Sequence, residues 1–403
     1  MPPDVASVED PSTSQAQQRA ADGDNILKHV EALSAEWSEQ RKERQCRREL
    51  DPADFDRLTE AGFPLTGVPA EQGGIWQGAS RSVRHVCGLL RVLARADSSV
   101  ALVSAMHPTV LAFWLATPKV PEAYQPAWDE QRRHIFSTVR DGAWWGTLTS
   151  EPGSGGDLTQ TRAVARPSAK PPTSEYQLIG DKAFGSGSGV TSYMMTVAIP
   201  EGEELPDLFY LGVRNAAWDG SSGVRLSAAW DGQGMAATQS HAFRFDGYPL
   251  TRAAWPANLP TLAAAVQPYI RCCFTSVFVG ITETAIATAR KELAKRRTVR
   301  PFEQVEFARA ELDGWLLVQA YEGMLRAIED GSTNTARTTV LGKVAVAELA
   351  ESALTRLCRI IGGGTFTRSS PFGNWAQDVR ALGFLRAPWG LAFDALIEQP
   401  SED

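Results

Sequence analysis

The sequence predicts an α+β protein in which a β-rich middle segment separates two helical segments. From about residue 25 to 143, apolar side chains recur at three- and four-residue steps, as in SVRHVCGLLRVLARAD. Between 144 and 258 the apolar runs are short and are divided by Pro, Gly, Asp and Ser, which is typical of strands. From 259 to 403 long helical patterns return. We therefore expect an N-terminal all-α domain, a middle antiparallel β-barrel or sandwich, and a C-terminal four-helix bundle.

The N-terminal segment begins with a polar stretch. Residues 1–24 include MPPDVASVEDPSTSQAQQ, whose Pro, Ser and Gln content predicts a disordered lead-in. This stretch lacks a basic patch followed by an apolar run, so we expect no secretory signal. Further on, Asp51 followed by Pro52 is a typical helix start, because an aspartate caps the first turn and proline is tolerated there.

The middle and C-terminal elements follow from their apolar periods. Four β-rich runs stand out in the middle segment: YQLIG, SYMMTVAIP, LFYLGVR and HAFRFDGYPL. In the C-terminal segment, residues 269–297 could form one helix of more than seven turns. A second helix is predicted over 342–361, where Val346, Leu349, Ala353 and Leu357 share one face.

Composition excludes several classes of protein. The 403 residues are 43% hydrophobic and 22% charged, with a net charge of −7, so a nucleic-acid-binding face is not expected. The five cysteines show no C-x-x-C spacing, so we expect reduced thiols and no metal site. No run approaches eighteen uninterrupted apolar residues, so we expect no membrane span and a soluble, cytoplasmic protein.

Five motifs, in order, carry a family resemblance. They are DPADFDRLTEAGFPLTGVPAEQGG, TSEPGSGGDL, YQLIGDKAFGSGSG, DGQGMAATQSHAFRFDGYPL and RIIGGGTFTRSSPFGNWAQDVRAL. Together they resemble the acyl-CoA dehydrogenase superfamily of flavoproteins over roughly residues 25–395. The resemblance implies bound FAD or FMN, a homodimer or homotetramer, and a small-molecule substrate.

The resemblance also implies which residues hold the isoalloxazine ring. Thr147, Leu148 and Ser150 match the glycine-rich loop that lies along the ring. Phe184 would stack on the ring face, and Ser186 would place a hydroxyl near its edge. A flat, partly apolar heterocycle needs both kinds of contact. The alternative is that the loop is a simple turn and that Phe184 belongs to the core; Trp144 and Trp145, just before the loop, are expected in the barrel core.

The resemblance gives less complete matches for the residues that would bind the pyrophosphate and adenosine of the flavin. Arg297 and Arg300 match a basic position that binds the flavin pyrophosphate of a neighbouring subunit, although a basic helix end is also favoured without a ligand. Gly362 and Gly363 match a turn near the adenosine, where Arg359 replaces a common glutamine. Adenine binding is therefore less firmly implied than isoalloxazine binding.

The catalytic glutamate of the dehydrogenases is missing. Its two usual positions are occupied here by Arg386, in QDVRALGFLRAP, and by Ile270, in PYIRCC. Glu322, in a Y-E-G triplet, falls in the middle of a predicted helix and is interpreted as a helix-face residue. The missing base favours the class D flavin monooxygenases, which react reduced flavin with O₂ to form a C4a-peroxyflavin. In that branch His107 matches an active-site histidine; its alternative is a structural role in helix packing.

Three functions therefore remain open. The first is a two-component monooxygenase that receives reduced flavin from a separate reductase, with His107 and Arg386 as candidate catalytic residues. The second is an acyl-CoA or acyl-carrier-protein dehydrogenase whose base has moved to Asp378, Asp394 or Glu398. The third is a flavin-binding protein without catalytic activity.

Overall fold

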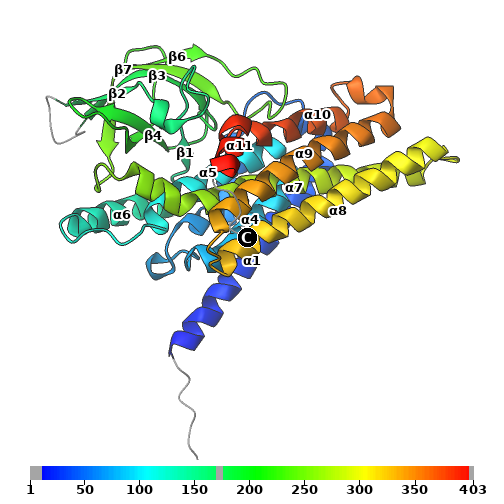
Figure 1. Cartoon of the computed structure of the whole chain (residues 1–403), viewed down its shortest axis with the longest axis horizontal. Helices are drawn as coiled ribbons and strands as arrows, with labels where there is room; N and C mark the ends of the chain where they lie inside the picture. Colours follow the sequence, from blue (N-terminus) through cyan, green and yellow to red (C-terminus); the bar gives the residue numbers. More distant parts are fainter. Residues whose placement is uncertain (1–10, 169–175, 399–403) are drawn as a thin grey trace, which may run out of the picture.

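The computed structural model describes residues 11–168 and 176–398, and its elements follow the predicted order of helices, sheet and helices (Figure 1). The N-terminal helices are α1 (Pro11–Glu39), α2 (Arg41–Arg44), α3 (Pro52–Glu60), α4 (Ala79–Ala94), α5 (Ser98–Leu115) and α6 (Gln125–Arg140). The expectation of a disordered lead-in over 1–24 is wrong for residues 11–24, which belong to α1; residues 1–10 lie outside the described residues. The Ala and Gln content of this stretch explains the helix, because both residues have high helix propensity.

Side-chain caps set where two of these helices begin. The Asp51 carboxylate accepts the backbone N–H of Ala53 at 3.0 Å, which confirms the predicted start of α3. The Asp97 carboxylate likewise accepts the N–H of Val100 at 3.0 Å and begins α5. Each cap satisfies a donor that a helix N-terminus leaves unpaired.

The middle segment forms one sheet that closes on itself. Its strands are β1 (Trp145–Thr147), β2 (Val164–Pro167), β3 (Tyr176–Gly185), β4 (Tyr193–Pro200), β5 (Asp207–Gly212), β6 (Val224–Ala228) and β7 (His241–Arg252). Strands β4, β2, β3, β7 and β5 pair in that order, and the β4–β5 pairing closes a five-stranded ring. The expectation of an antiparallel barrel needs one correction, since β1 and β2 each pair with β4 in parallel.

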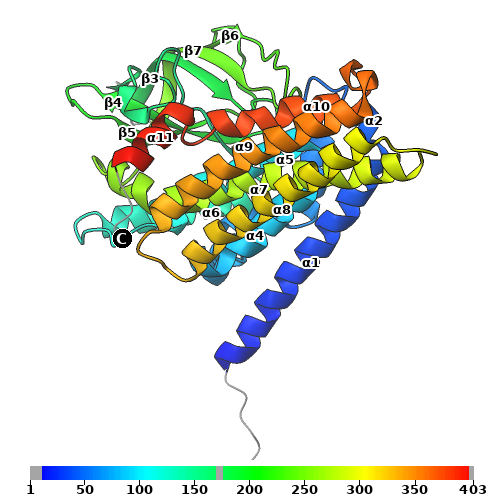
Figure 2. The same cartoon turned by 45° about the vertical axis from the view of Figure 1, so that its right-hand side comes forward.

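The C-terminal segment contains three long helices and two short ones. These are α7 (Leu259–Ala294), α8 (Pro301–Glu329), α9 (Thr335–Ile361), α10 (Pro371–Asp378) and α11 (Trp389–Glu398). The expected bundle has four helices, whereas the structure has three long ones, α7, α8 and α9. Two short helices, α10 and α11, follow in place of a fourth long helix. Figures 1 and 2 both show α11 between the β-domain and α9, so the last described helix lies beside the strands.

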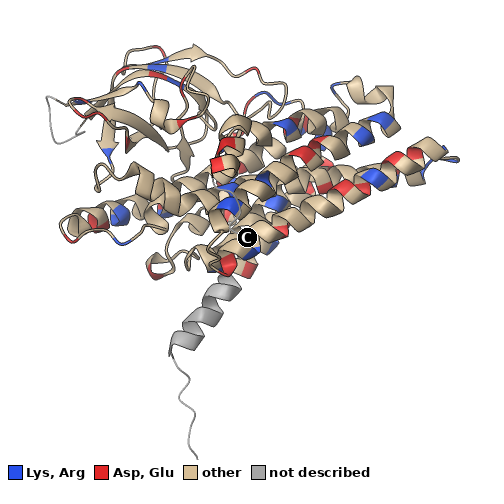
Figure 3. Ribbon diagram, in the orientation of Figure 1, with Lys and Arg blue, Asp and Glu red and all other residues tan. Residues whose placement is uncertain are grey.

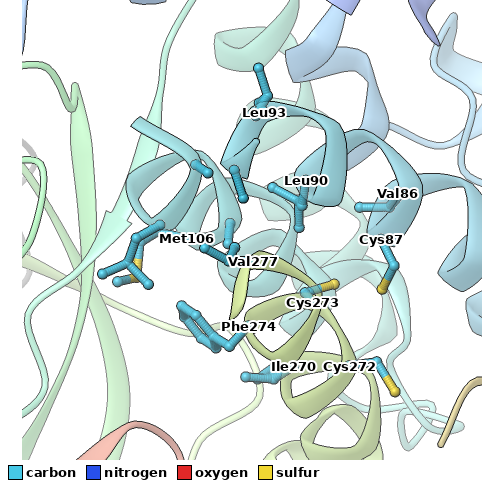
Figure 4. Packing of buried hydrophobic residues seen from close by; sticks show 14 of the residues in the cluster. Val86, Cys87, Leu90, Leu93, Met106, Ile270, Cys272, Cys273, Phe274 and Val277 are labelled. Atoms are coloured by element: carbon cyan, nitrogen blue, oxygen red, sulfur yellow. The ribbon is translucent and has the colours of Figure 1, made fainter. Parts of the chain in front are cut away.

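The core lies where α4 and α5 pack against α7 (Figure 4). Gly280 on α7 allows the close crossing, because a β-carbon there would lie 2.4 Å from the carbonyl oxygen of Arg91 on α4. Cys87, Cys272 and Cys273 are buried at this junction as free thiols. Burial raises the pKa of Cys272 and Cys273 well above the ordinary thiol value, so both stay protonated.

Within the described residues, two helices are long and apolar enough to cross a membrane, α5 (Ser98–Leu115) and α7 (Leu259–Ala294). The most apolar 18-residue window of each is 89% and 78% buried inside the fold, respectively. Such burial is typical of core helices. Figure 3 shows acidic and basic residues interspersed along α8 and α9 instead of a surface of one sign.

Candidate functional site

The glycine-rich loop, residues 149–158, follows β1 in the chain. It contacts the end of β3 and also the C-terminal segment. The Ser150 carbonyl accepts the Ala183 N–H at 2.9 Å, which places the loop beside the residue preceding Phe184. Gly156 has a φ of +83°, and a β-carbon there would lie 2.7 Å from Cγ of Pro388. Glycine is thus required by both backbone conformation and space. The loop lies against the segment that carries Arg386.

The first of the two carboxylates in the loop, Glu151, has a structural partner. Glu151 accepts a hydrogen bond of 2.6 Å from the ammonium of Lys182, a fully buried side chain on β3. The same carboxylate accepts the backbone N–H of Arg162 and the Thr161 hydroxyl. These bonds lower the pKa of Glu151 against the opposing effect of burial. Glu151 therefore anchors the loop and is not available for chemistry.

Phe184 is displayed on the surface beside the loop. Its side chain is 58% exposed and its φ is +58°, a left-handed conformation that is rare for an aromatic residue. The ring meets Trp230 edge-on, with centroids 6.2 Å apart. Two residues on, the Ser186 and Ser240 hydroxyls lie 2.8 Å apart. The expectation that Phe184 could be a core residue is wrong, and an exposed aromatic face next to hydroxyls fits a flat heterocycle.

The Arg386 side chain contacts the end of β1 and the first residues of the loop that follows it. One guanidinium nitrogen, Nη2, donates to the hydroxyls of Thr147 at 3.1 Å and Thr149 at 3.3 Å. The other terminal nitrogen, Nη1, is buried without a hydrogen-bond partner in the structure. Burial lowers the pKa of Arg386 to about 10, so the side chain is still a cation at neutral pH. The position expected for a catalytic base thus holds a positive charge next to Thr147.

No carboxylate stands in for the missing base among the side chains that were candidates for it. Ile270 is only 2% exposed in the core of α7. The Asp378 carboxylate accepts the Ser98 hydroxyl at 2.5 Å and the Met235 N–H at 2.6 Å, so it holds three segments together. Asp394 and Glu398 lie on exposed positions of α11.

Glu322 behaves as the helix-face residue that the sequence predicts. It forms an ion pair of 2.9 Å with Arg84, on the outer side of the contact between α8 and α4. The Y-E-G triplet therefore has no part in the site.

His107 is a packing residue in this structure. It is completely buried on α5; its Nε2 lies 3.1 Å from the Pro64 carbonyl, and its Nδ1 accepts the Trp145 N–H at 3.0 Å. Burial lowers its pKa to about 4, so it is neutral with Nε2 as the donor. Both nitrogens are committed to backbone groups, which corrects the expectation of a catalytic role. Its ring also contacts Trp144, with centroids 5.1 Å apart.

Leu148 also differs from its predicted role. Its side chain belongs to the barrel core, and its N–H and carbonyl bond the Met195 carbonyl at 2.8 Å and the Thr196 hydroxyl at 2.6 Å. It therefore supports the strand from behind. Trp144 and Trp145 were expected in the barrel core but pack in the cluster of the N-terminal helices.

The residues expected at the far end of the cofactor lie elsewhere in the chain. Arg297 and Arg300 are exposed at the turn between α7 and α8, at the end of the molecule away from the β-domain (Figure 1). Arg359 forms an ion pair of 3.4 Å with Glu306 on α8. A β-carbon on Gly362 or Gly363 would meet no atom within 4 Å, so this turn has open space around it. A single chain does not bring these residues to Phe184.

Sequence reasoning missed two cations, Lys343 and Arg271, near the segment that carries Arg386. The Lys343 ammonium on α9 is 2% exposed and donates to the Ala387 carbonyl at 2.5 Å. Arg271 on α7 donates to the Thr339 hydroxyl at 3.3 Å. Burial and the charge of Arg271 lower the pKa of Lys343 to about 8. No motif signals these residues, because their proximity depends on how α7, α9 and the C-terminal segment pack.

Comparison with known proteins identifies the class of fold. No family model matches the sequence. Among curated proteins, the amino sugar nitrososynthase DnmZ of Streptomyces peucetius is 25% identical over 389 residues, covering 90% of this chain and 88% of that protein.

Two solved structures extend that comparison. KijD3, solved with FMN and a dTDP-amino-keto sugar, superimposes with a TM-score of 0.78, 21% identity and 95% coverage of each chain. FMN-bound TdsC from Paenibacillus sp. A11-2 gives a TM-score of 0.75 at 16% identity, covering 94% of this chain and 99% of that one. The chain has the acyl-CoA dehydrogenase-like fold that flavin-dependent oxidoreductases share, which confirms the resemblance recognised in the sequence.

Proposed function

We propose that this chain is a flavin-dependent monooxygenase that acts in the cytoplasm on a small organic molecule. It takes reduced FMN or FAD from a separate reductase. The observation that carries the proposal is the guanidinium of Arg386, held by the Thr147 and Thr149 hydroxyls where the dehydrogenases place a carboxylate. A permanent cation cannot remove an α-proton, and the alternative position holds the buried, apolar Ile270. Oxygenation by a reduced flavin needs no such base.

The residues around Phe184 fit the polar and apolar parts of a flavin. Phe184 offers its exposed face to the ring, while Ser186 and the Thr147 hydroxyl offer hydrogen bonds at the edge. When bound, the reduced flavin would supply the electrons and the position at which O₂ reacts. Gly156 lies close to Pro388, and we infer that this contact helps to keep water out on the loop side.

The named relatives support oxygenation of a heteroatom. DnmZ is an amino sugar nitrososynthase, and a second TdsC structure describes that protein as a dibenzothiophene monooxygenase. We infer that nitrogen or sulfur is the atom oxidised here. A panel of amino sugars, aryl sulfides and indoles covers both elements.

The test uses the full chain with photochemically reduced FMN, ¹⁸O₂ and this panel of substrates. We expect incorporation of one ¹⁸O atom into product and a transient absorbance distinct from both reduced and oxidised flavin. Anaerobic bleaching of bound oxidised flavin by an acyl thioester would instead indicate a dehydrogenase. Tight flavin binding with no turnover in either assay would indicate a flavoprotein without catalytic activity.

We further infer that the protein works as a homodimer or homotetramer. The helix α8 exposes large apolar side chains to solvent in the single chain: Phe302, Val305, Leu312 and Trp315 are 52–59% exposed. Such a patch on a soluble domain is typical of a protein interface. An interface there would also bring Arg297 and Arg300, at the start of the same helix, close to a second chain.

A further inference from the structure

Arg386 is a half-buried cation that has no counter-charge among the described residues. Among the described residues, its hydrogen bonds go to the two neutral hydroxyls of Thr147 and Thr149, and no ion pair includes it. Removing a charge from water is costly unless an opposite charge compensates it. The chain itself therefore leaves the guanidinium under-satisfied, and its buried Nη1 atom has no partner in the structure.

Two further cations lie near the segment that carries Arg386. Lys343 donates to the carbonyl of Ala387, the residue that follows Arg386. Arg271 lies near enough to Lys343 for the two charges to repel each other, which contributes to the lowered pKa of Lys343. Neither Lys343 nor Arg271 forms an ion pair within the described part of the chain. Lys343 and Arg271 are thus near each other, and Lys343 joins α9 to the residue that follows Arg386.

Two other arginines of this protein have carboxylate partners. Arg44 is buried between Asp54 at 2.6 Å and Asp97 at 2.9 Å, and Arg252 bonds both Glu203 and Asp207. For these two guanidinium groups the chain itself supplies the opposite charge. The absence of one beside Arg386 points to an anion that comes from outside the chain.

We propose that Arg386 binds a negatively charged group of the substrate, a carboxylate, sulfur oxyacid or phosphate, beside the flavin ring. Lys343 positions the segment through the Ala387 carbonyl. The guanidinium offers a planar fork of N–H donors that matches such oxyanions, and Nη1 is the donor left for them. This inference deepens the proposed function and rests on it for the position of the ring next to Thr147.

The experiment titrates the full-length protein with inorganic phosphate and with acetate at constant ionic strength, in the presence and absence of saturating FMN. Binding is followed by calorimetry and by melting temperature. We compare the wild type with Arg386→Gln, Arg386→Lys and the control Arg214→Gln. Arg214 is a suitable control because it is exposed in the same β-domain and donates to the Ser192 hydroxyl at 2.6 Å.

Saturable anion binding is expected in the wild type and in Arg214→Gln, with at least tenfold weaker binding in Arg386→Gln and partial recovery in Arg386→Lys. The affinity for FMN, measured by fluorescence quenching, is expected to stay within threefold. The ligand-free Arg386→Gln protein should melt no lower than the wild type, because an uncompensated charge has been removed. This last result separates a binding role from a purely structural one.

Three outcomes would overturn the inference. One is the lack of saturable anion binding by the wild type, and another is unchanged anion binding in Arg386→Gln. The third is a joint loss of anion and FMN affinity, which would assign the arginine to the flavin. Failure to bind any flavin would instead refute the proposed function, and it would be seen in the FMN titration independently of the anion result.

Discussion

Gly156 and Pro388 touch so closely that any side chain on the glycine would collide with the proline. A β-carbon on Gly156 would lie 2.7 Å from the proline Cγ, whereas one on Gly155 would meet nothing within 4 Å. Both glycines have a positive φ, of +83° and +61°. Alanine substitutions at Gly155 and Gly156 therefore separate the free-energy cost of the left-handed backbone from the cost of the collision with Pro388.

The first prediction compares Gly156→Ala with Gly155→Ala. Both should lose about 1 kcal/mol from the left-handed backbone. Gly156→Ala should lose a further ~1–3 kcal/mol from overpacking and should also weaken flavin binding, since Pro388 must move. Urea denaturation and FMN titration of both variants measure this. Equal losses in the two variants would show that the contact with Pro388 is unimportant.

The second prediction concerns His107 and acid. Its folded-state pKa of about 4 lies below the ordinary 6.5, so between these values the unfolded chain binds a proton that the folded chain does not. The free energy of unfolding should therefore fall as the pH decreases from 6.5 to 4, by up to about 3 kcal/mol from this group. His107→Asn should be less stable at pH 7 but should lose less stability over this window. Identical pH profiles would contradict the assignment of a buried neutral ring.

The third prediction tests the buried pair of Glu151 and Lys182. Either Glu151→Gln or Lys182→Met should destabilise the protein by about 3–5 kcal/mol, because each leaves an unpaired charge in the barrel. The double variant should recover part of that loss. The exposed pair Arg166–Glu201, 3.4 Å apart, serves as a control, with an effect of about 0.5 kcal/mol or less for either change. Full additivity of the two core substitutions in urea denaturation would argue against a coupled pair.

The fourth prediction concerns Phe184 and the flavin. Because its ring is 58% exposed, Phe184→Leu should barely alter the stability of the ligand-free protein. Loss of the aromatic face should weaken FMN binding by about tenfold. Tyr124→Leu is the control, since that ring is 40% exposed at the start of α6, in the N-terminal segment. Unchanged FMN affinity in Phe184→Leu would remove this residue from the cofactor site.

The fifth prediction concerns the apolar face of α8. Leu312→Glu should dissociate the expected oligomer, because a charge would be buried in the interface. Leu205→Glu changes a leucine that is 69% exposed on the β-domain and should have no such effect. Light scattering distinguishes the two variants. An oligomer that survives Leu312→Glu would place the interface elsewhere.

Local patterns predicted the elements of the fold well. The four β-rich runs correspond to β3, β4, β5 and β7, and the two long C-terminal patterns fall in α7 and α9. These are runs in which apolar spacing and turn residues agree with one another. The parallel pairing of β1 and β2 with β4 was not predictable in this way, because no local feature of a strand determines the direction of a distant partner.

The site was predicted in part, and the misses have a common cause. The assignment of Phe184 and Thr147 to the flavin site stays a prediction; the structure joins their segments through the bridge between Ser150 and Ala183. His107 and Leu148 were misassigned because their roles depend on which groups three-dimensional packing brings to them. The hydrogen bond from Lys343 to the Ala387 carbonyl likewise joins residues that are distant in sequence.

The three buried thiols at the junction of α4 and α7 bear on how well the protein resists oxidation. Oxidants attack the thiolate, and the raised pKa of Cys272 and Cys273 keeps both in the unreactive, protonated form. Under the proposed function, hydrogen peroxide released from the reduced flavin would therefore oxidise Cys272 and Cys273 only slowly. Cys46 is the exposed cysteine of the chain, so sulfenic acid formed during turnover should appear there first.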